Sequence, residues 1–153
     1  MTRPFNEIRL QFPSRSSNEA FARSAAAAFI AQLDPGVDEL ADIRTAVSEA
    51  VTNCIVHAYP ASIGMIHMNI RMFPSGRTVI KIRDHGCGIE DIPKAMEPLF
   101  TTGGEERSGL GFSVMESFCD RVRVSSRPGR GTAVTLEKNI AMRPQKPVEV
   151  SLV

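Results

Sequence analysis

Apolar and polar side chains alternate along residues 6–13, and this period of two predicts a half-buried β-strand. Two helical patterns follow, over about 17–33 and about 37–58. The first is rich in alanine, and the second carries a continuous stripe of apolar residues at helical spacing. Ser16 and Glu19 have the spacing of a capping box, which would begin the first helix. This part of the chain therefore predicts a strand followed by two helices.

The remainder of the chain consists of strand patterns and turns, with one long interruption. Four further strands are expected at 63–73, 77–83, 121–126 and 132–139. Pro74-Ser75-Gly76 predicts a hairpin turn between the first two of these strands. The periodicity fails from residue 86 to about 108, and loops of this length are usually functional or disordered. A helix is expected from 109 to about 119.

The predicted order is β-α-α-β-β-loop-α-β-β, which is typical of an α/β protein with two layers. We therefore expect a two-layer α/β sandwich, in which a mixed, mostly antiparallel sheet carries helices on one face. Residues 1–141 are expected to form one domain, because a chain of this length can bury a sizeable hydrophobic core. Residues 142–153 contain Pro144 and Pro147 and are expected to form a disordered tail.

The composition narrows the function classes. The chain has 153 residues, of which 42% are hydrophobic and 23% are charged, as in ordinary globular proteins. A net charge of +1 and the lack of a dense run of lysine and arginine give no support to direct nucleic-acid binding. The longest apolar run, residues 25–31, is too short to cross a bilayer, so we expect no membrane contact and a cytoplasmic location. Cys54, Cys87 and Cys119 lack the spacing of a disulfide framework or a zinc site.

A polar stripe interrupts the second helical pattern. Glu49, Asn53 and His57 are spaced four apart and so would lie on one helix face. Such a stripe usually faces solvent. The neighbours of Asn53, however, are nearly all small or apolar, and a helix that is buried almost all round directs its few polar groups at a site. By itself, the stripe favours a functional site only slightly.

A second motif, Asp84-His85-Gly86-Cys87-Gly88, follows a buried-strand pattern. A carboxylate just past the end of a strand lies where open sheets commonly contact ligands, and it can accept a hydrogen bond from an amine such as that of adenine. The two glycines would let a flat ring approach the backbone closely. An ordinary turn that contains Asp and Gly is the alternative when this motif is considered alone.

Two further glycine motifs come later in the chain. Gly109-Leu110-Gly111 opens a helix and offers free N–H groups to phosphate oxygens, with Arg107 just before it. A flexible loop that ends at a helix is the alternative for this motif. Gly131-Thr132 begins the last strand. The chain contains no P-loop, because Gly-Lys-Ser/Thr is absent from the sequence. Taken in order, the four motifs predict one ATP site.

These four motifs resemble the nucleotide-binding boxes of the histidine kinase, gyrase B, Hsp90 and MutL ATPase superfamily, the Bergerat fold. Within it, the chain is similar to the small bacterial anti-sigma factor serine kinases over nearly all of residues 6–140. The segments that carry this resemblance most clearly are 19–23, 48–53, 98–102 and 106–112. Two positions depart from the family pattern. Gly103-Gly104 stands where a Lys-Pro pair is expected, and Ala58 stands where glycine is common.

The resemblance implies a role for each polar residue of the motifs. Glu49 would be the general base that takes the proton from a substrate serine, and Asn53 would ligate Mg²⁺ through its carboxamide oxygen. Asp84 would bind the adenine amino group, with Thr132 supporting it through water. Arg107 would reach the phosphates and assist the transfer.

The resemblance also implies an ATP lid over about 96–111 and a partner-binding surface that includes Glu19 and Arg23. The further ATP contacts that it implies are Gly86, Gly88, Thr101, Ser108, Gly109, Leu110 and Gly111. A homodimer formed through the N-terminal strand and helix is what the family suggests.

The implied function is an anti-sigma factor with serine kinase activity. In its ATP-bound form it would bind and inhibit an RNA polymerase sigma factor of sporulation, and it would phosphorylate an anti-anti-sigma protein on serine. Three alternatives stay open: an ATP-gated binding module without kinase activity, an anti-sigma kinase of the general stress response, and an excised histidine-kinase catalytic domain. Glu49 favours an enzyme, since ATP binding alone needs no base beside Asn53. The N-terminal strand and helix disfavour the excised domain.

Overall fold

The computed structural model describes residues 3–96 and 111–141, in which five strands form one sheet. The strands are β1 (Asn6–Pro13), β2 (Met65–Met72), β3 (Arg77–Asp84), β4 (Arg121–Arg127) and β5 (Gly131–Asn139). Their order across the sheet is β1-β2-β3-β5-β4. Each of the four neighbouring pairs is antiparallel. The last strand of the chain therefore lies inside the sheet, between β3 and β4.

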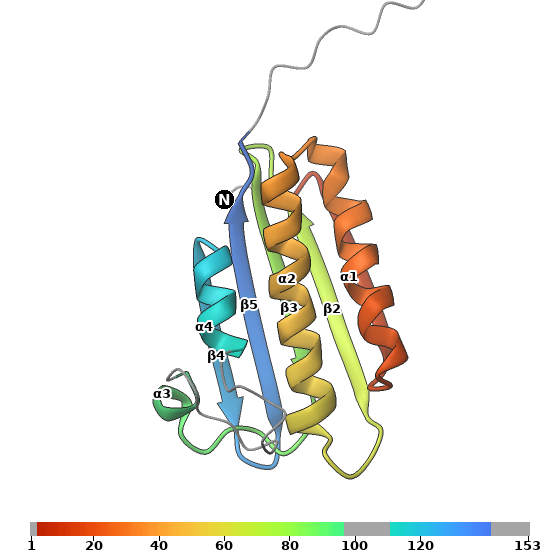
Figure 1. Ribbon diagram of the computed structural model, residues 1–153, viewed down its shortest axis with the longest axis vertical. Coiled ribbons are helices and arrows are strands. Elements are labelled where there is room, and N and C mark those ends of the chain that lie inside the picture. Colours follow the sequence, from red (N-terminus) through yellow and green to blue (C-terminus); the bar gives the residue numbers. More distant parts are fainter. Residues whose placement is uncertain (1–2, 97–110, 142–153) are drawn as a thin grey trace, which may run out of the picture.

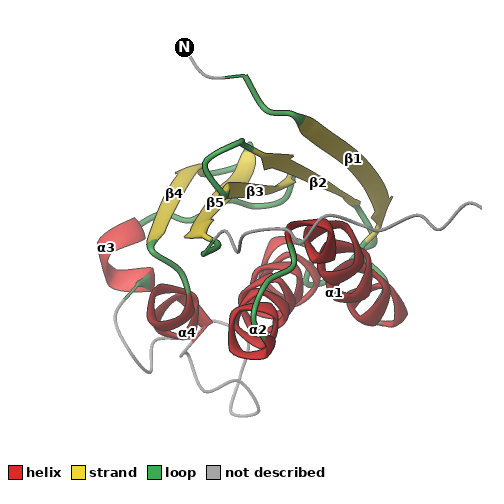
Figure 2. Ribbon diagram, turned by 90° about the horizontal axis from the view of Figure 1, so that it is seen from above, coloured by secondary structure: helices red, strands yellow, loops and turns green. Residues whose placement is uncertain are grey.

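Three helices cover one face of the sheet, and no described helix covers the other (Figure 1 and Figure 2). They are α1 (Ser17–Ile30), α2 (Val37–Asn53) and α4 (Gly111–Phe118), and α2 lies between the other two. α1 continues as a 3₁₀ turn (Ala31–Leu33), and α2 continues as a π-helical turn (Cys54–Ala58). A short helix, α3 (Ile92–Ala95), lies near the β4 end of the sheet. This arrangement confirms the expected two-layer α/β sandwich.

The core lies between the sheet and the three helices, because every second residue of the central strands faces the helices. The buried apolar strand residues include Ile66, Met68, Ile70, Met72, Ile80, Ile82 and Leu136. From α1 the core receives Ala22, Ala26 and Ile30, which are spaced four apart and almost inaccessible to solvent. The small side chains of the buried alanines let α1 lie close to the sheet and to α2.

The capping box expected at Ser16 and Glu19 is wrong. Ser16 already has helical dihedral angles (φ −57°, ψ −33°), and its side chain makes no capping hydrogen bond. The chain turns earlier, since the Asn18 N–H donates to the Arg15 carbonyl oxygen at 2.9 Å. The Glu19 carboxylate instead accepts a hydrogen bond from the Ser48 hydroxyl of α2. Glu19 therefore joins α1 to α2 and does not cap α1.

The expected interruption after residue 86 contains one helix that the periodicity did not predict. α3 begins after Asp91, whose carboxylate accepts a hydrogen bond from the Lys94 backbone N–H at 3.1 Å. Pro93 lies in the first turn of this helix, where its missing N–H leaves no hydrogen bond unmade. An Asp N-cap followed by Pro is a helix-start signal that the sequence carries.

The other expected elements agree with the structure to within about two residues, the usual uncertainty of element ends. The tail expected over 142–153 lies outside the described residues, so the expected domain limits stay a prediction. Across the described residues, no helix is both long enough and apolar enough to cross a membrane.

Candidate functional site

Two polar residues of the expected stripe, Glu49 and Asn53, meet the beginning of α4. Both are half-buried, and they lie one turn apart on α2. A Cβ atom at Gly111 would lie 3.2 Å from Asn53 Oδ1 and 3.4 Å from Glu49 Oε2, so glycine allows this close approach. Within the described residues, Glu49 makes no hydrogen bond or ion pair. Its carboxylate therefore holds together no part of the fold that the structure describes.

The stripe does not continue regularly to His57, because α2 ends in the π-helical turn. Such turns are rare and occur frequently at functional sites. The turn begins with Cys54, which is buried beside Asp84. Burial raises the pKa of the Cys54 thiol well above its usual range, and the Asp84 carboxylate raises it further. The end of α2 and the end of β3 are thus in contact.

Asp84, the last residue of β3, is only 4% exposed and is held by two backbone donors. Its Oδ1 accepts hydrogen bonds from the N–H groups of Gly86 (2.9 Å) and Thr132 (3.1 Å). The second bond crosses from β3 to the beginning of β5. Because both donors reach Oδ1, Oδ2 takes part in neither bond and could accept a ligand amine. Such a bond gains strength from burial, since the local dielectric is low.

Ser126 is a site residue that the sequence analysis missed. It lies on β4, and its hydroxyl accepts a hydrogen bond from the Ile89 N–H (2.8 Å) and donates one to the Gly131 carbonyl oxygen (3.1 Å). Ser126 Oγ also lies 2.7 Å from Thr132 Oγ1. Either hydroxyl could be the donor in this pair. No motif marks Ser126 in the sequence.

Gly86 and Gly88 are required by contacts within the protein. A Cβ atom at Gly86 would overlap the Ala58 carbonyl group, and one at Gly88 would overlap the Arg127 carbonyl group. The turn that contains them is joined to both neighbours, since the Cys87 N–H donates to the Ala58 oxygen at 3.1 Å and the Cys87 oxygen accepts from the Gly129 N–H at 2.7 Å. These contacts explain the two glycines without a ligand, and their expected contact with an adenine ring stays a prediction.

Five residues of the expected site lie outside the described residues: Thr101, Arg107, Ser108, Gly109 and Leu110. The expected lid over 96–111 is therefore described only at its ends, Met96 and Gly111. The roles that the resemblance implies for these five residues stay predictions. In the described ranges, no group of three or more His, Cys, Asp or Glu side chains could hold a metal ion.

Comparison with known proteins decides the family. Residues 12–138 match the family model described as a histidine kinase-like ATPase domain. Over 137 residues the chain is 56% identical to the anti-sigma F factor of Thermoanaerobacter sp. (strain X514), and the match covers 88% of this chain and 94% of the relative. It is 51% identical over 138 residues to the anti-sigma F factor of Geobacillus kaustophilus (strain HTA426), with 89% and 94% covered. The chain belongs to the anti-sigma F factor family.

Solved structures agree with the fold of this family member. The RsbU and RsbW domains of Rv1364c from Mycobacterium tuberculosis superpose with a TM-score of 0.66 at 20% identity, covering 95% of this chain and 35% of that one. The histidine kinase domain of the Erythrobacter litoralis EL346 blue-light activated histidine kinase gives a TM-score of 0.55 at 21% identity, covering 80% and 60%. At these identities the two likenesses confirm the fold that the resemblance implies.

Glu19 and Arg23, which the family resemblance places on a partner-binding surface, form an ion pair on α1 at 3.4 Å. Their side chains are 18% and 45% exposed. Glu19 is also held from α2 by the Ser48 hydroxyl, whereas the Arg23 guanidinium bonds only to Glu19 within the described residues. Arg23 is therefore the member of the pair that can turn toward a partner without breaking a contact between helices.

Proposed function

We propose that the chain is an ATP-dependent anti-sigma factor and a protein serine kinase. In its ATP-bound form it binds and inhibits an RNA polymerase sigma factor, which the names of the relatives suggest is sigma F. It transfers the γ-phosphate of ATP to a serine of an anti-anti-sigma antagonist, and it acts as a homodimer. The observation that carries this proposal is the Glu49 carboxylate, which is half-buried at the beginning of α4 with no partner among the described residues.

The proposed ATP site extends from the end of β3 to the beginning of α4. Asp84 Oδ2 would accept a hydrogen bond from the adenine amino group, because two backbone N–H groups fix the carboxylate through Oδ1. The first N–H groups of α4 and the positive end of its dipole favour phosphate oxygens near Gly111. Asn53 Oδ1 suits Mg²⁺, which prefers oxygen ligands and takes several of them from water and substrate phosphates.

Phosphoryl transfer needs positioning and charge neutralisation more than covalent chemistry from the protein. Glu49 would accept the proton of the serine hydroxyl as the serine oxygen bonds to the γ-phosphorus. The bond from that phosphorus to its bridging oxygen breaks, and ADP leaves. Glu49 and Asn53 lie one turn apart on α2, so the base and the magnesium ligand act from the same helix face. Arg107 is proposed to reach the phosphates.

The proposal is tested by incubating the chain with labelled ATP, Mg²⁺ and candidate anti-anti-sigma proteins. We expect label on a serine of one candidate, located by mass spectrometry, and ATP-dependent inhibition of transcription by the sigma factor. Tight ATP binding with no transfer to any candidate would reject the kinase and leave an ATP-gated binding module. Inhibition of a stress-response sigma factor instead would show that the proposed sigma-factor partner is wrong. It would leave the proposed kinase reaction unchanged.

We expect Asp84→Asn to lower ATP affinity by about 10- to 150-fold, since a charge-assisted hydrogen bond contributes about 1.5–3 kcal/mol. The asparagine oxygen can keep both backbone N–H bonds, which turns the amide nitrogen toward the ligand amine. Both of these groups are hydrogen-bond donors, so no hydrogen bond can form between them. Calorimetry measures the affinity, and thermal unfolding checks the fold. Asp38→Asn, an exposed change on α2, is the control. Near-wild-type affinity in a folded Asp84→Asn chain would contradict the adenine assignment.

We expect Arg23→Ala to leave ATP affinity unchanged and to weaken association with the sigma factor and the antagonist. An exposed pair at this spacing stabilises a helix by only about 0.3–0.5 kcal/mol. An interface arginine can contribute about 2 kcal/mol or more, roughly thirtyfold in affinity. Pull-down of each partner measures the effect, with Arg44→Ala, exposed on α2, as the control. Recovery of both partners at wild-type levels would leave this surface without its proposed role.

A further inference from the structure

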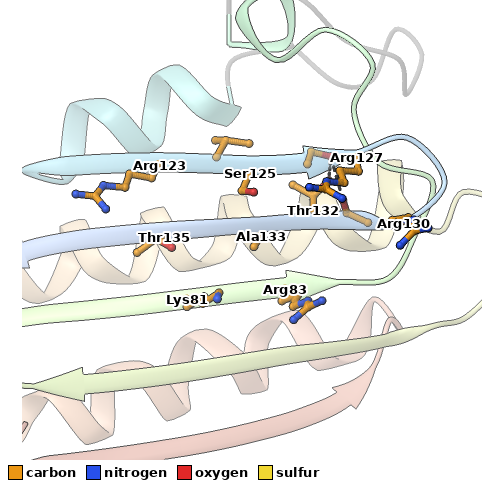
Figure 3. A pocket seen from close by; sticks show the side chains of 12 residues that line it. Lys81, Arg83, Arg123, Ser125, Arg127, Arg130, Thr132, Ala133 and Thr135 are labelled. Carbon is orange, nitrogen blue, oxygen red and sulfur yellow. Dashed lines mark hydrogen bonds between the residues drawn. The ribbon is translucent and has the colours of Figure 1, made fainter.

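A hollow of about 610 Å³ lies on the face of the sheet that no described helix covers, and it borders the candidate ATP site at Ser126 and Thr132. It is formed by β3, β4, β5 and the turn between β4 and β5 (Figure 3). Five of its lining side chains are cationic: Lys81, Arg83, Arg123, Arg127 and Arg130. None of the lining residues is acidic. We call this feature the basic hollow.

The strand register explains why a hollow forms here. On β5, the middle strand, Thr135 lies between Lys81 of β3 and Arg123 of β4. The next outward residue, Ala133, lies between Arg83 of β3 and a serine of β4. Short side chains therefore form the floor, and long cationic side chains of the neighbouring strands form the walls (Figure 3). Alternation along each strand directs all of these side chains away from the helices.

The cations of the basic hollow have no partners among the described residues, since none of the five side chains makes an ion pair or a hydrogen bond there. Some other cations of the same sheet are paired. Arg71 Nε lies 2.7 Å from Glu7 Oε2, and Arg77 Nε lies 2.6 Å from Glu137 Oε1. Acidic side chains thus neutralise these two arginines, whereas no described acidic side chain pairs with the five cations of the hollow. Five like charges gathered in one place repel one another, and bound anions would relieve that repulsion.

We propose that the basic hollow binds an extended acidic segment of a protein partner. Arginine and lysine side chains recognise carboxylates, and four of the five cations are arginines, which bind them in bidentate pairs. Residues two apart on a strand are separated by about 6.8 Å, the same interval that separates alternate side chains of an extended peptide. Lys81 and Arg83 therefore match two carboxylates on one side of such a segment.

A protein segment fits this surface better than a nucleic acid. No aromatic side chain lines the hollow, so unpaired bases would find no stacking platform. The whole chain carries a net charge of +1, and five of its cations lie in the hollow, so the other residues together carry a net charge of −4. Outside the hollow, the chain therefore offers a long polyanion no net positive charge. A second copy of this chain would present the same positive charge, and residues 142–153 contain a single acid, Glu149.

The basic hollow is independent of the proposed partner surface on α1. The hollow lies at the β4 end of the sheet, on the face opposite the helices, whereas α1 lies at the β1 and β2 end (Figure 2). A partner held at Arg23 and an acidic segment held in the hollow could therefore be bound at the same time. The proposal does not depend on the kinase activity or on ATP binding.

The test is fluorescence anisotropy with a labelled poly-glutamate peptide of about ten residues, roughly 33 Å when extended. The full chain should bind it, and Arg83→Glu/Arg123→Glu should weaken binding by about tenfold, because two attractions become repulsions. The matched control, Arg15→Glu/Arg44→Glu, makes the same charge change at exposed positions outside the hollow and should bind as wild type does. ATP affinity and melting temperature check that both variants are folded.

Three results would overturn the proposal. One is no binding of the peptide by the wild-type chain. Another is an equal loss of binding in the hollow variant and in the control, which would show that net charge alone attracts the peptide. The third is tighter binding of a labelled DNA duplex than of the peptide with the same sensitivity to Arg83→Glu/Arg123→Glu, which would make the hollow a nucleic-acid surface.

Discussion

Replacing Glu49 with glutamine is expected to leave ATP binding intact and to lower the rate of serine phosphorylation by about 10²–10⁴-fold. Glutamine has nearly the same shape but cannot accept a proton from the attacking hydroxyl. Because Glu49 has no partner in the described residues, the change breaks no hydrogen bond or ion pair among them. The loss should therefore appear in the rate constant for transfer, with ATP affinity by calorimetry close to that of the wild-type chain.

A matched control is Glu116→Gln, which neutralises an exposed carboxylate on the neighbouring helix α4. Single-turnover phosphorylation of the antagonist compares the two variants at saturating ATP. Normal transfer by Glu49→Gln would show that this carboxylate is not the base. The kinase would then need another proton acceptor, or the chain would be an ATP-gated binding module that the antagonist merely contacts.

Replacing Gly131 with alanine is expected to destabilise the fold by about 3 kcal/mol or more. Gly131 has φ +105°, a conformation that costs other residues about 1–3 kcal/mol. A Cβ atom there would also overlap the Asp84 carbonyl oxygen and lie 2.8 Å from His85 Cα. Relief of this overlap requires β5 to move away from the end of β3, which breaks the hydrogen bond between Thr132 and Asp84.

Gly129 provides the control for this change. It has a similar positive φ of +75°, but a Cβ atom there would meet nothing within 4 Å. Gly129→Ala should therefore cost only the backbone strain, about 1–2 kcal/mol. Urea unfolding of both variants separates the steric effect from the strain. Equal destabilisation by the two changes would mean that steric overlap with Asp84 adds nothing to the free energy of unfolding lost by Gly131→Ala.

Local patterns predicted the elements well, because their causes are local. The period of two in the strands and the apolar stripe of the second helix arise from each segment facing one core. The position of β5 inside the sheet could not be predicted in this way, since it depends on the pairing of β3 with a strand that comes much later in the chain. The capping box predicted from the Ser16–Glu19 spacing was wrong for a related reason, because the Glu19 carboxylate bonds to Ser48 of another helix.

The candidate site was predicted where its residues form motifs and missed where they act through tertiary contacts. Asp84 and Thr132 were both expected, but the direct bond between them follows from the register of β3 and β5. Ser126 has no neighbouring motif and gains its role only by facing Thr132 on the next strand. The basic hollow could not be predicted from the sequence, because its cations lie on two strands and a turn, and only the pairing of β3 and β4 with β5 brings Lys81 and Arg83 beside those of residues 123–130.

The long-range pairing of β3 with β5 also determines when a nucleotide site can exist during folding. β2 with β3, and β4 with β5, are hairpins of consecutive strands that can form from local sequence. The β3–β5 pairing closes a loop that contains residues 85–130, and such non-local contacts form slowly. Because Thr132 holds Asp84 across this pairing, a partly assembled chain does not yet have in place the carboxylate that we propose binds adenine. ATP would therefore bind only to molecules in which the two halves of the sheet have paired. Its binding would shift the folding equilibrium toward this folded state.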